Sequence, residues 1–362
     1  MTLLGHSAIN PGTPGGAIEV FRDLYSGYSP AIPGEAFMLG SPRHSGDLPR
    51  RMGLLNVGIG ESGADYRRSV SALRRALLAA LDGTAPAVLH LHYLTFAGTE
   101  ALLQAFPHTP RIAFVHGADV LAAERDRDHH DTLRETVRRA ETIVIPNESL
   151  ARKVVDLSTP AVWERIEVMP WGIPDHLVSG PAGAPPAPSS TLRLLYAGRA
   201  DEPGLLSVLR ALGPVGGVAL HVMTPGRQRV DLSTLKGKPT AYLRPQFTGP
   251  LPRHRLWSQF TAYDALVLPT TGLETTGRLA LEAQACGLPV IYQPTRWLRT
   301  LLGNSGWPLD FADRAAVTAD MRRLRRSAVL LPALRAAGRE NAARYRLSAM
   351  AATLHRLGAQ LT

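Results

Sequence analysis

The sequence of 362 residues has a single cysteine, Cys286, and is poor in aromatic residues, which make up 6% of it. One cysteine excludes an intramolecular disulfide framework and every zinc site that needs several thiolates. No apolar run reaches the roughly 20 residues that a membrane-spanning helix requires. The first residues also lack the basic segment followed by an apolar one that marks an export signal. We therefore expect a cytoplasmic protein.

Lysine is nearly absent as well. The net charge is +10, yet only three of the 40 basic residues are lysines, namely Lys153, Lys236 and Lys238. Arginine in place of lysine, with abundant alanine, glycine and proline, is typical of a GC-rich genome, so the charge alone is weak evidence about partners. No stretch interleaves aromatic residues with arginines, and no nucleic-acid-binding module is recognisable. We expect no nucleic-acid partner.

Alternating strand and helix patterns predict parallel sheets covered by helices. The length and the patterns indicate two domains. Their expected bounds are 1–174 and 191–340, with a linker rich in Pro, Ala and Gly at 175–190 and a final helical segment at 341–362. Ligands of open parallel sheets bind beyond the carboxyl ends of the strands. Functional residues are therefore expected where strands end.

The predicted elements of the first half are strands at 2–4, 36–39, 54–59, 87–92, 112–115, 142–145 and 166–169, and helices at 16–25, 66–81, 131–140 and 149–157. Those of the second half are strands at 192–197, 218–222, 240–243, 265–268 and 289–292, helices at 205–212, 253–261, 278–286 and 297–302, and a helical tail from residue 315.

The most informative stretch reads YDALVLPTTGLETTGRLALEAQACGLPVIYQ, a strand, a polar loop, a helix and a second strand. Glu274 lies in the loop and Glu282 lies inside the helix, with seven residues between them. Thr275, Thr276 and Gly277 offer backbone N–H groups at the helix N-terminus, where a phosphate is favoured. Carboxylates on either side can accept hydrogen bonds from sugar hydroxyls. The pattern also fits a surface acid and a helix-face acid in an ordinary βαβ unit.

This stretch resembles the nucleotide-sugar signature of retaining glycosyltransferases of family 4. The resemblance rests on Leu268-Pro269-Thr270, on the two glutamates and on the run LEAQACGLPV, and it departs at Thr275-Thr276, where the family more often has Gly-Phe. It implies an α/β fold of the GT-B type, with two Rossmann-like domains whose parallel sheets face each other across a cleft. In that fold the N-terminal domain binds the acceptor, the C-terminal domain binds the nucleotide sugar, and the last helix crosses back to the first domain.

Further landmarks resemble the family in the same order. Gly15-Gly16 resembles the glycine loop beside the phosphates, and the segment from His116 to Asp119 resembles the lining of the donor-sugar pocket. Gly198-Arg199 resembles the end of the first strand of the second domain, whose arginine binds the pyrophosphate. The lysine that usually follows a few residues later is absent. Arg227 or Arg229 is the expected substitute.

The resemblance implies transfer of a sugar from a nucleoside-diphosphate sugar to an acceptor hydroxyl with retention of configuration, without a metal or other cofactor. Arg199 and the helix N-terminus at Gly277 would stabilise the leaving diphosphate. Glu274 would orient the donor sugar, Glu282 would hold the ribose, and His116 would contact the sugar or the β-phosphate. UDP-sugars are the favoured donors, and a small molecule, such as an antibiotic precursor, or a glycan is the expected acceptor.

The expected site residues are, as catalytic residues, His116, Glu274 and Arg199; as donor-binding residues, Gly15, Gly16, Gly198, Thr275, Thr276, Gly277, Arg278, Glu282, Thr248 and Gly249; and as acceptor-binding residues, His92, Tyr93, Asp119 and Asn147.

Alternatives remain open. The missing lysine also fits a weakly active or inactive GT-B binding subunit. The run Gly58–Gly63 has the form G-x-G-x-x-G and would suit an NAD-dependent oxidoreductase, although no acid ends the next strand as that fingerprint expects. The run DRDHHD at 126–131 is a less favoured metal site, and the arginine-rich helix at 67–81 is a less favoured membrane contact. The oligomeric state is left open.

Overall fold

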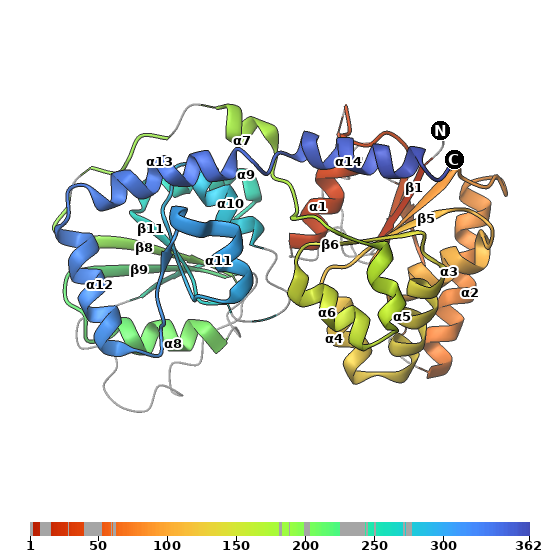
Figure 1. Ribbon diagram of the computed structural model, residues 1–362, viewed down its shortest axis with the longest axis horizontal. Coiled ribbons are helices and arrows are strands. Elements are labelled where there is room, and N and C mark those ends of the chain that lie inside the picture. Colours follow the sequence, from red (N-terminus) through yellow and green to blue (C-terminus); the bar gives the residue numbers. More distant parts are fainter. Residues whose placement is uncertain are drawn as a thin grey trace. The chain divides into compact units, whose positions relative to one another are not determined.

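The structure is a computed structural model, and it describes the chain apart from residues 1–2, 8–15, 28, 40–52, 59, 61–62, 181–182, 188, 199–202, 225–242, 244, 250, 271 and 273–276. The chain divides into two compact units, residues 1–172 with 347–362, and residues 173–346 (Figure 1). Outside the described residues lie Gly15, Arg199, Glu274, Thr275, Thr276, Arg227 and Arg229.

The first unit is built on a parallel sheet with the strand order β3-β2-β1-β4-β5-β6-β7. Its strands are β1 (Leu3–Ser7), β2 (Glu35–Leu39), β3 (Gly53–Leu55), β4 (Val88–His92), β5 (Arg111–Phe114), β6 (Thr142–Ile145) and β7 (Ile166–Val168). Every residue of the central strands β4 and β5 is buried. Burial without alternation is what a parallel sheet covered on both faces requires.

Helices cover this sheet. They are α1 (Gly16–Tyr25), α2 (Gly63–Ala80), α3 (Ala97–Ala105), α4 (Ala118–Arg125), α5 (Arg127–Arg139), α6 (Glu148–Asp156) and α14 (Leu347–Ala359), with a short 3-10 turn at Pro160–Arg165. The α2 helix buries Val70, Leu73 and Leu77 on one face, so its apolar stripe packs in the protein interior. Among the described residues no helix is both long and apolar enough to cross a bilayer.

The chain returns to the first unit at its end. The final segment, expected at 341–362, contains the last two residues of α13 (Leu330–Ala342) and the helix α14, which belongs to the first unit. Met350 and Leu354 of α14 are buried in the same core as Phe21 of α1 and Trp171. The α14 helix therefore completes the hydrophobic core of the first unit, and Figure 1 shows it running beside α1.

The second unit repeats the plan with the strand order β10-β9-β8-β11-β12-β13, again parallel. Its strands are β8 (Leu192–Ala197), β9 (Val218–Met223), β10 (Gln246–Thr248), β11 (Ala265–Leu268), β12 (Val290–Tyr292) and β13 (Trp307–Pro308). Its helices are α7 (Asp175–Ser179), α8 (Pro203–Leu212), α9 (Arg253–Gln259), α10 (Arg278–Ala285), α11 (Arg296–Leu302), α12 (Arg314–Arg326) and α13.

The predicted α/β class with parallel sheets is confirmed in both units. One local expectation needs correction, and another can be tested at a single residue only. Residues 175–190 are not linker throughout, because they begin with α7, whose Leu177 and Val178 pack on the core of the second unit. The strand expected at 240–243 lies outside the described residues except for Leu243, which is buried without belonging to a strand. The outer strand of this sheet is β10 instead.

Candidate functional site

His116 lies at the carboxyl edge of the first sheet, in the loop that follows β5. Its imidazole is enclosed by Tyr93 and Trp171, with ring centroids 4.6 and 5.3 Å away, and its Nε2 lies 3.1 Å from Nδ1 of His92. The ring is only 4% exposed. Burial lowers the pKa of His116 to about 3, so the imidazole is neutral at neutral pH.

Asp119 fixes the backbone around His116. Its carboxylate accepts hydrogen bonds from the backbone N–H groups of Leu94 at 3.0 Å, Val120 at 3.0 Å and His116 at 3.2 Å. It thereby ties the loop after β4 to the loop after β5. The side chain is fully buried, and desolvation raises its pKa to about 6 despite these bonds. Asp119 is built to hold the loops in place.

The other residues expected to bind an acceptor are also internal. Asn147 caps α6, because its side-chain oxygen accepts a hydrogen bond from the Leu150 N–H at 2.9 Å. Asn147, His92 and Tyr93 are at most 3% exposed. Tyr93 has a φ of +77°, an uncommon conformation that turns the chain where β4 ends. Together with Asp119, these side chains support the strand ends. Their geometry favours a positioning role over direct contact with an acceptor.

In the second unit, Gly277 begins α10 in the left-handed conformation, with a φ of +75°. A Cβ at this position would collide with the side chain of Leu301. Only glycine therefore fits where the chain enters the helix. The loop before it comes from β11, so the N-terminus of α10 lies at the carboxyl edge of the second sheet.

Glu282 lies one turn inside α10 and is 5% exposed. Its carboxylate accepts from Arg253 Nη2 at 2.5 Å and from the indole N–H of Trp257 at 2.8 Å. Arg278 Nε lies 3.6 Å from the same carboxylate. The guanidinium of Arg253 also stacks over the Trp257 ring at 4.7 Å. Glu282 is thus a buried anion held by two arginines and an indole. Arg253 and Trp257 are not among the site residues expected from the sequence.

Three of the expected glycine and threonine positions, Gly198, Thr248 and Gly249, follow or end strands at the carboxyl edge of the second sheet. Gly198 follows β8, and its N–H donates to the Met223 carbonyl at 3.0 Å. Thr248 ends β10, and its hydroxyl lies 3.1 Å from Nε2 of His221. A Cβ on Gly249 would meet no atom of the described residues within 4 Å. Gly16 lies in the other unit, exposed at the first position of α1.

The comparison with protein families locates the match in the first half of the chain. Residues 35–177 match the model described as Glycosyltransferase Family 4. The N-terminal unit carries a glycosyltransferase family 4 domain. The family resemblance inferred from the sequence is therefore confirmed. No curated protein matches the chain significantly.

Solved structures extend the likeness to the full length. Sucrose-phosphate synthase from Thermosynechococcus elongatus aligns with a TM-score of 0.75 at 16% identity, covering 100% of this chain and 99% of the other. HepE from Anabaena, in complex with UDP and glucose, aligns at 0.73 and 13% identity over 99% of both chains. A trehalose-6-phosphate synthase aligns at 0.71 and 14% identity over 100% of both chains. These likenesses show that the chain has the GT-B fold.

The glycosyltransferase family 4 domain also contains the G-x-G-x-x-G run, and its geometry opposes a dinucleotide site. The Gly63 N–H at the start of α2 donates to Asp128 Oδ2 at 2.9 Å, and the Gly60 N–H donates to Ser69 Oγ at 2.7 Å. A Cβ on Gly60 would lie 2.7 Å from the backbone carbon of Asp65. The glycine is explained by close packing. A carboxylate occupies the helix N-terminus that a pyrophosphate would need.

The DRDHHD run of the family 4 domain is likewise structural. Asp126 caps α5 by accepting from the His129 N–H at 3.2 Å, and His129 Nδ1 lies 2.9 Å from the Thr95 carbonyl oxygen. Over the part of the chain that the structure describes, no group of three or more His, Cys, Asp or Glu residues is arranged to hold a metal ion.

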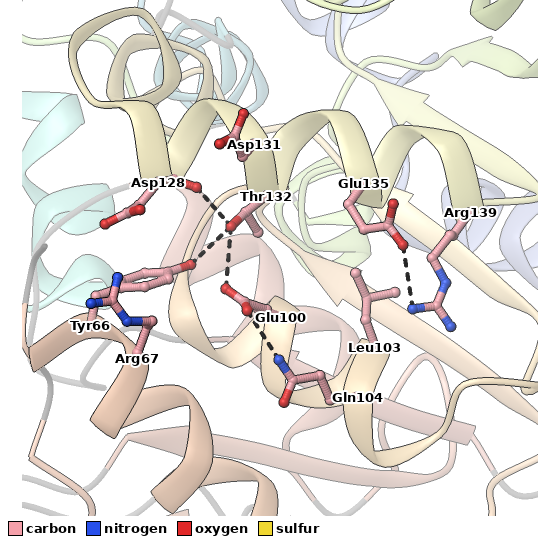
Figure 2. Close-up of a pocket in the computed structure, with 10 residues that line it drawn as sticks. All are labelled: Tyr66, Arg67, Glu100, Leu103, Gln104, Asp128, Asp131, Thr132, Glu135 and Arg139. Carbon is pink, nitrogen blue, oxygen red and sulfur yellow. Dashed lines mark hydrogen bonds and ion pairs between the residues drawn. The ribbon is translucent and has the colours of Figure 1, made fainter. Parts of the chain in front are cut away.

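A groove of about 360 Å3 lies on the outer helical layer of the family 4 domain. Its wall comes from α2, α3 and α5 and includes the carboxylates of Glu100, Asp128, Asp131 and Glu135 (Figure 2). Glu135 pairs there with Arg139 at 3.7 Å. None of the expected site residues lines this groove. It is a polar surface between helices.

Proposed function

We propose that this protein transfers a sugar from a nucleoside-diphosphate sugar, with UDP-sugars preferred, to a hydroxyl of a small-molecule or glycan acceptor, with retention of anomeric configuration. The observation that carries the proposal is the strand, glycine turn and helix at β11 and α10, with Glu282 buried one turn inside. The match of residues 35–177 to glycosyltransferase family 4 supports it. So do the likeness to HepE, which was solved with UDP and glucose, and to a trehalose-6-phosphate synthase studied for transfer with retention.

The second unit supplies the groups for a nucleotide. The N-terminus of α10 carries partial positive charge, which stabilises the negative charge that develops on a leaving diphosphate. Arg199, which directly follows Gly198 at the end of β8, is the proposed partner for the diphosphate oxygens. Glu282 is the proposed acceptor for the ribose hydroxyls. Cationic side chains and the helix end together would make a metal ion unnecessary.

Glu282 must be exposed before it can bind ribose. Its Oε1 now accepts from Arg253 at 2.5 Å, and its Oε2 accepts from Trp257 at 2.8 Å. A ribose hydroxyl that approaches this carboxylate has to replace part of the contact with Arg253. Without a donor, Arg253 therefore takes the place of the ribose hydroxyls at Glu282 and keeps the buried carboxylate paired.

The test is direct. UDP-sugars, GDP-sugars and ADP-sugars are screened by melting shift, and the best donor is then assayed for release of the nucleoside diphosphate with and without added acceptor alcohols. We expect UDP-sugars to raise the melting temperature most and to release UDP. Binding without release would instead support a binding subunit, which the absent lysine also fits. No binding of any nucleotide sugar would contradict the proposal.

A further inference from the structure

Four buried side chains in the first unit form a continuous hydrogen-bonded chain. The Tyr25 hydroxyl lies 2.7 Å from His90 Nδ1 and 2.8 Å from His92 Nε2. His92 Nδ1 lies 3.1 Å from His116 Nε2. None of the four side chains is more than 4% exposed. The chain thus links the end of α1, through two residues of β4, to His116 at the carboxyl edge of the sheet.

Counting protons shows that this hydrogen-bonded chain of four side chains has two arrangements in which every hydrogen bond is made. Each neutral imidazole carries one N–H and one lone pair, and Tyr25 carries one O–H. When Tyr25 donates to His92, the other bonds follow and all three histidines carry the proton on Nδ1. When Tyr25 donates to His90, every bond reverses and all three carry it on Nε2. A mixed set leaves the hydroxyl proton or a ring nitrogen unpaired, which is costly in a buried site.

Tyr25, His90 and His116 stay neutral, which favours these two states. Burial lowers the pKa of both His90 and His116 to about 3 and raises that of Tyr25 above its usual value. The terminal nitrogens, His90 Nε2 and His116 Nδ1, are buried and have no hydrogen-bond partner among the described residues. A buried nitrogen without a partner is costly unless a ligand or water pairs with it. At His116 it stands where ligands of parallel sheets bind.

We propose that Tyr25 and His92 are positioning residues that set the tautomer of His116, and thereby decide whether its Nδ1 donates a hydrogen bond to a sugar hydroxyl or accepts one. This inference rests on the proposed function and on the expectation that His116 contacts the donor sugar. The ring faces of His116 are fixed by Tyr93 and Trp171, so the tautomer is the property that the chain controls. A bound hydroxyl then selects one state of the whole chain.

The first experiment needs no activity. The intact protein is labelled with 15N-histidine, and the tautomers of His90, His92 and His116 are assigned by NMR in the wild type and in Tyr25→Phe. We expect all three histidines to share one tautomer in the wild type and to lose this agreement in the variant. Different tautomers within the wild type overturn the proposal even if the variant fails to fold.

The second experiment measures turnover. Tyr25→Phe should lower kcat by about 5–10-fold, the effect expected when one hydrogen bond that positions a reacting group is lost. The KM for the donor should change little. Tyr66→Phe is the matched control, because Tyr66 is also buried but its hydroxyl bonds the Thr95 carbonyl at 3.1 Å and the Thr132 hydroxyl at 3.2 Å. Equal kcat losses in the two variants would reduce Tyr25 to a packing role.

The two experiments separate the two proposals. Shared tautomers in a protein that transfers no sugar would leave the chain of hydrogen bonds standing and reject the proposed function. Mixed tautomers in an active enzyme would reject the inference about the hydrogen-bonded chain and leave the proposed function standing. A Tyr25→Phe variant with unchanged kcat and a native melting temperature would contradict the inference on its own.

Discussion

Replacing Glu282 with glutamine tests the buried carboxylate of the second unit. The change keeps the shape of the side chain but turns the partner of Arg253 and Arg278 into a neutral amide. The Glu282 and Arg253 side chains are only 6% and 15% exposed, so solvent screens their interaction weakly. Breaking a buried pair leaves a buried charge uncompensated and costs about 3 kcal/mol or more. In a domain of this size, that loss lowers the melting temperature by roughly 6–12 °C.

The same substitution should weaken the binding of UDP. Ribose hydroxyls lose a charged acceptor, and each such hydrogen bond is worth roughly 1.5–3 kcal/mol, or about 10–100-fold in affinity. Calorimetric titration of the folded variant with UDP measures this loss. Arg253→Met should keep or tighten UDP binding, because it frees Oε1 of Glu282 while Arg278 still balances its charge. Arg255→Met, on the exposed face of the same helix, is the control.

One result would contradict the expectation that Glu282 holds the ribose. If folded Glu282→Gln binds UDP as tightly as the wild type, Glu282 is a structural anion that joins α9 to α10 and has no part in holding the ribose. Tighter binding of UDP by Arg253→Met would then have no explanation either.

Three further predictions follow from the same sites. Arg199→Lys should lose turnover by about 10–100-fold and Arg199→Ala more, because lysine cannot bond two phosphate oxygens at once; near wild-type rates in a steady-state assay would place the diphosphate contact elsewhere. Turnover should survive EDTA, and a strict need for magnesium would refute the cationic clamp. The first unit should lose stability as the pH falls from 6.5 toward 3, because His90 and His116 are neutral when folded and bind protons when unfolded. Asp119, with a raised pKa of about 6, opposes them between about 3.8 and 6, and His90→Phe should flatten the slope in pH-dependent melting.

Most sheet strands could be predicted from the sequence because parallel strands bury both faces and read as short apolar runs. Those of β6, β8 and β11 have the predicted bounds. The α3 and α4 helices were missed. Six of the nine residues of α3 are buried, including Gly98 and Thr99, so it lacks the narrow apolar stripe that identifies a surface helix. The α4 helix is short and weakly amphipathic.

The site was predictable only in part. The positions of Gly277 and Glu282 follow from local spacing, which a strand, turn and helix fix within one segment. Arg253 and Trp257 reach Glu282 from a helix 25 to 29 residues earlier in the chain, and no local pattern records that contact. Tyr25 is 65 residues from His90 and was expected only as part of an amphipathic helix. Contacts set by tertiary packing could therefore not be predicted from the sequence.

The measurement that tests the central claim most directly is the anomeric configuration of the first product. The protein is incubated with a UDP-α-sugar, and the sugar that it transfers or releases is followed by 1H NMR from the first minutes, before the free sugar mutarotates. The account predicts the α-anomer, formed together with one equivalent of UDP. A β-anomer, or release of no sugar from any nucleotide donor that binds, would contradict it.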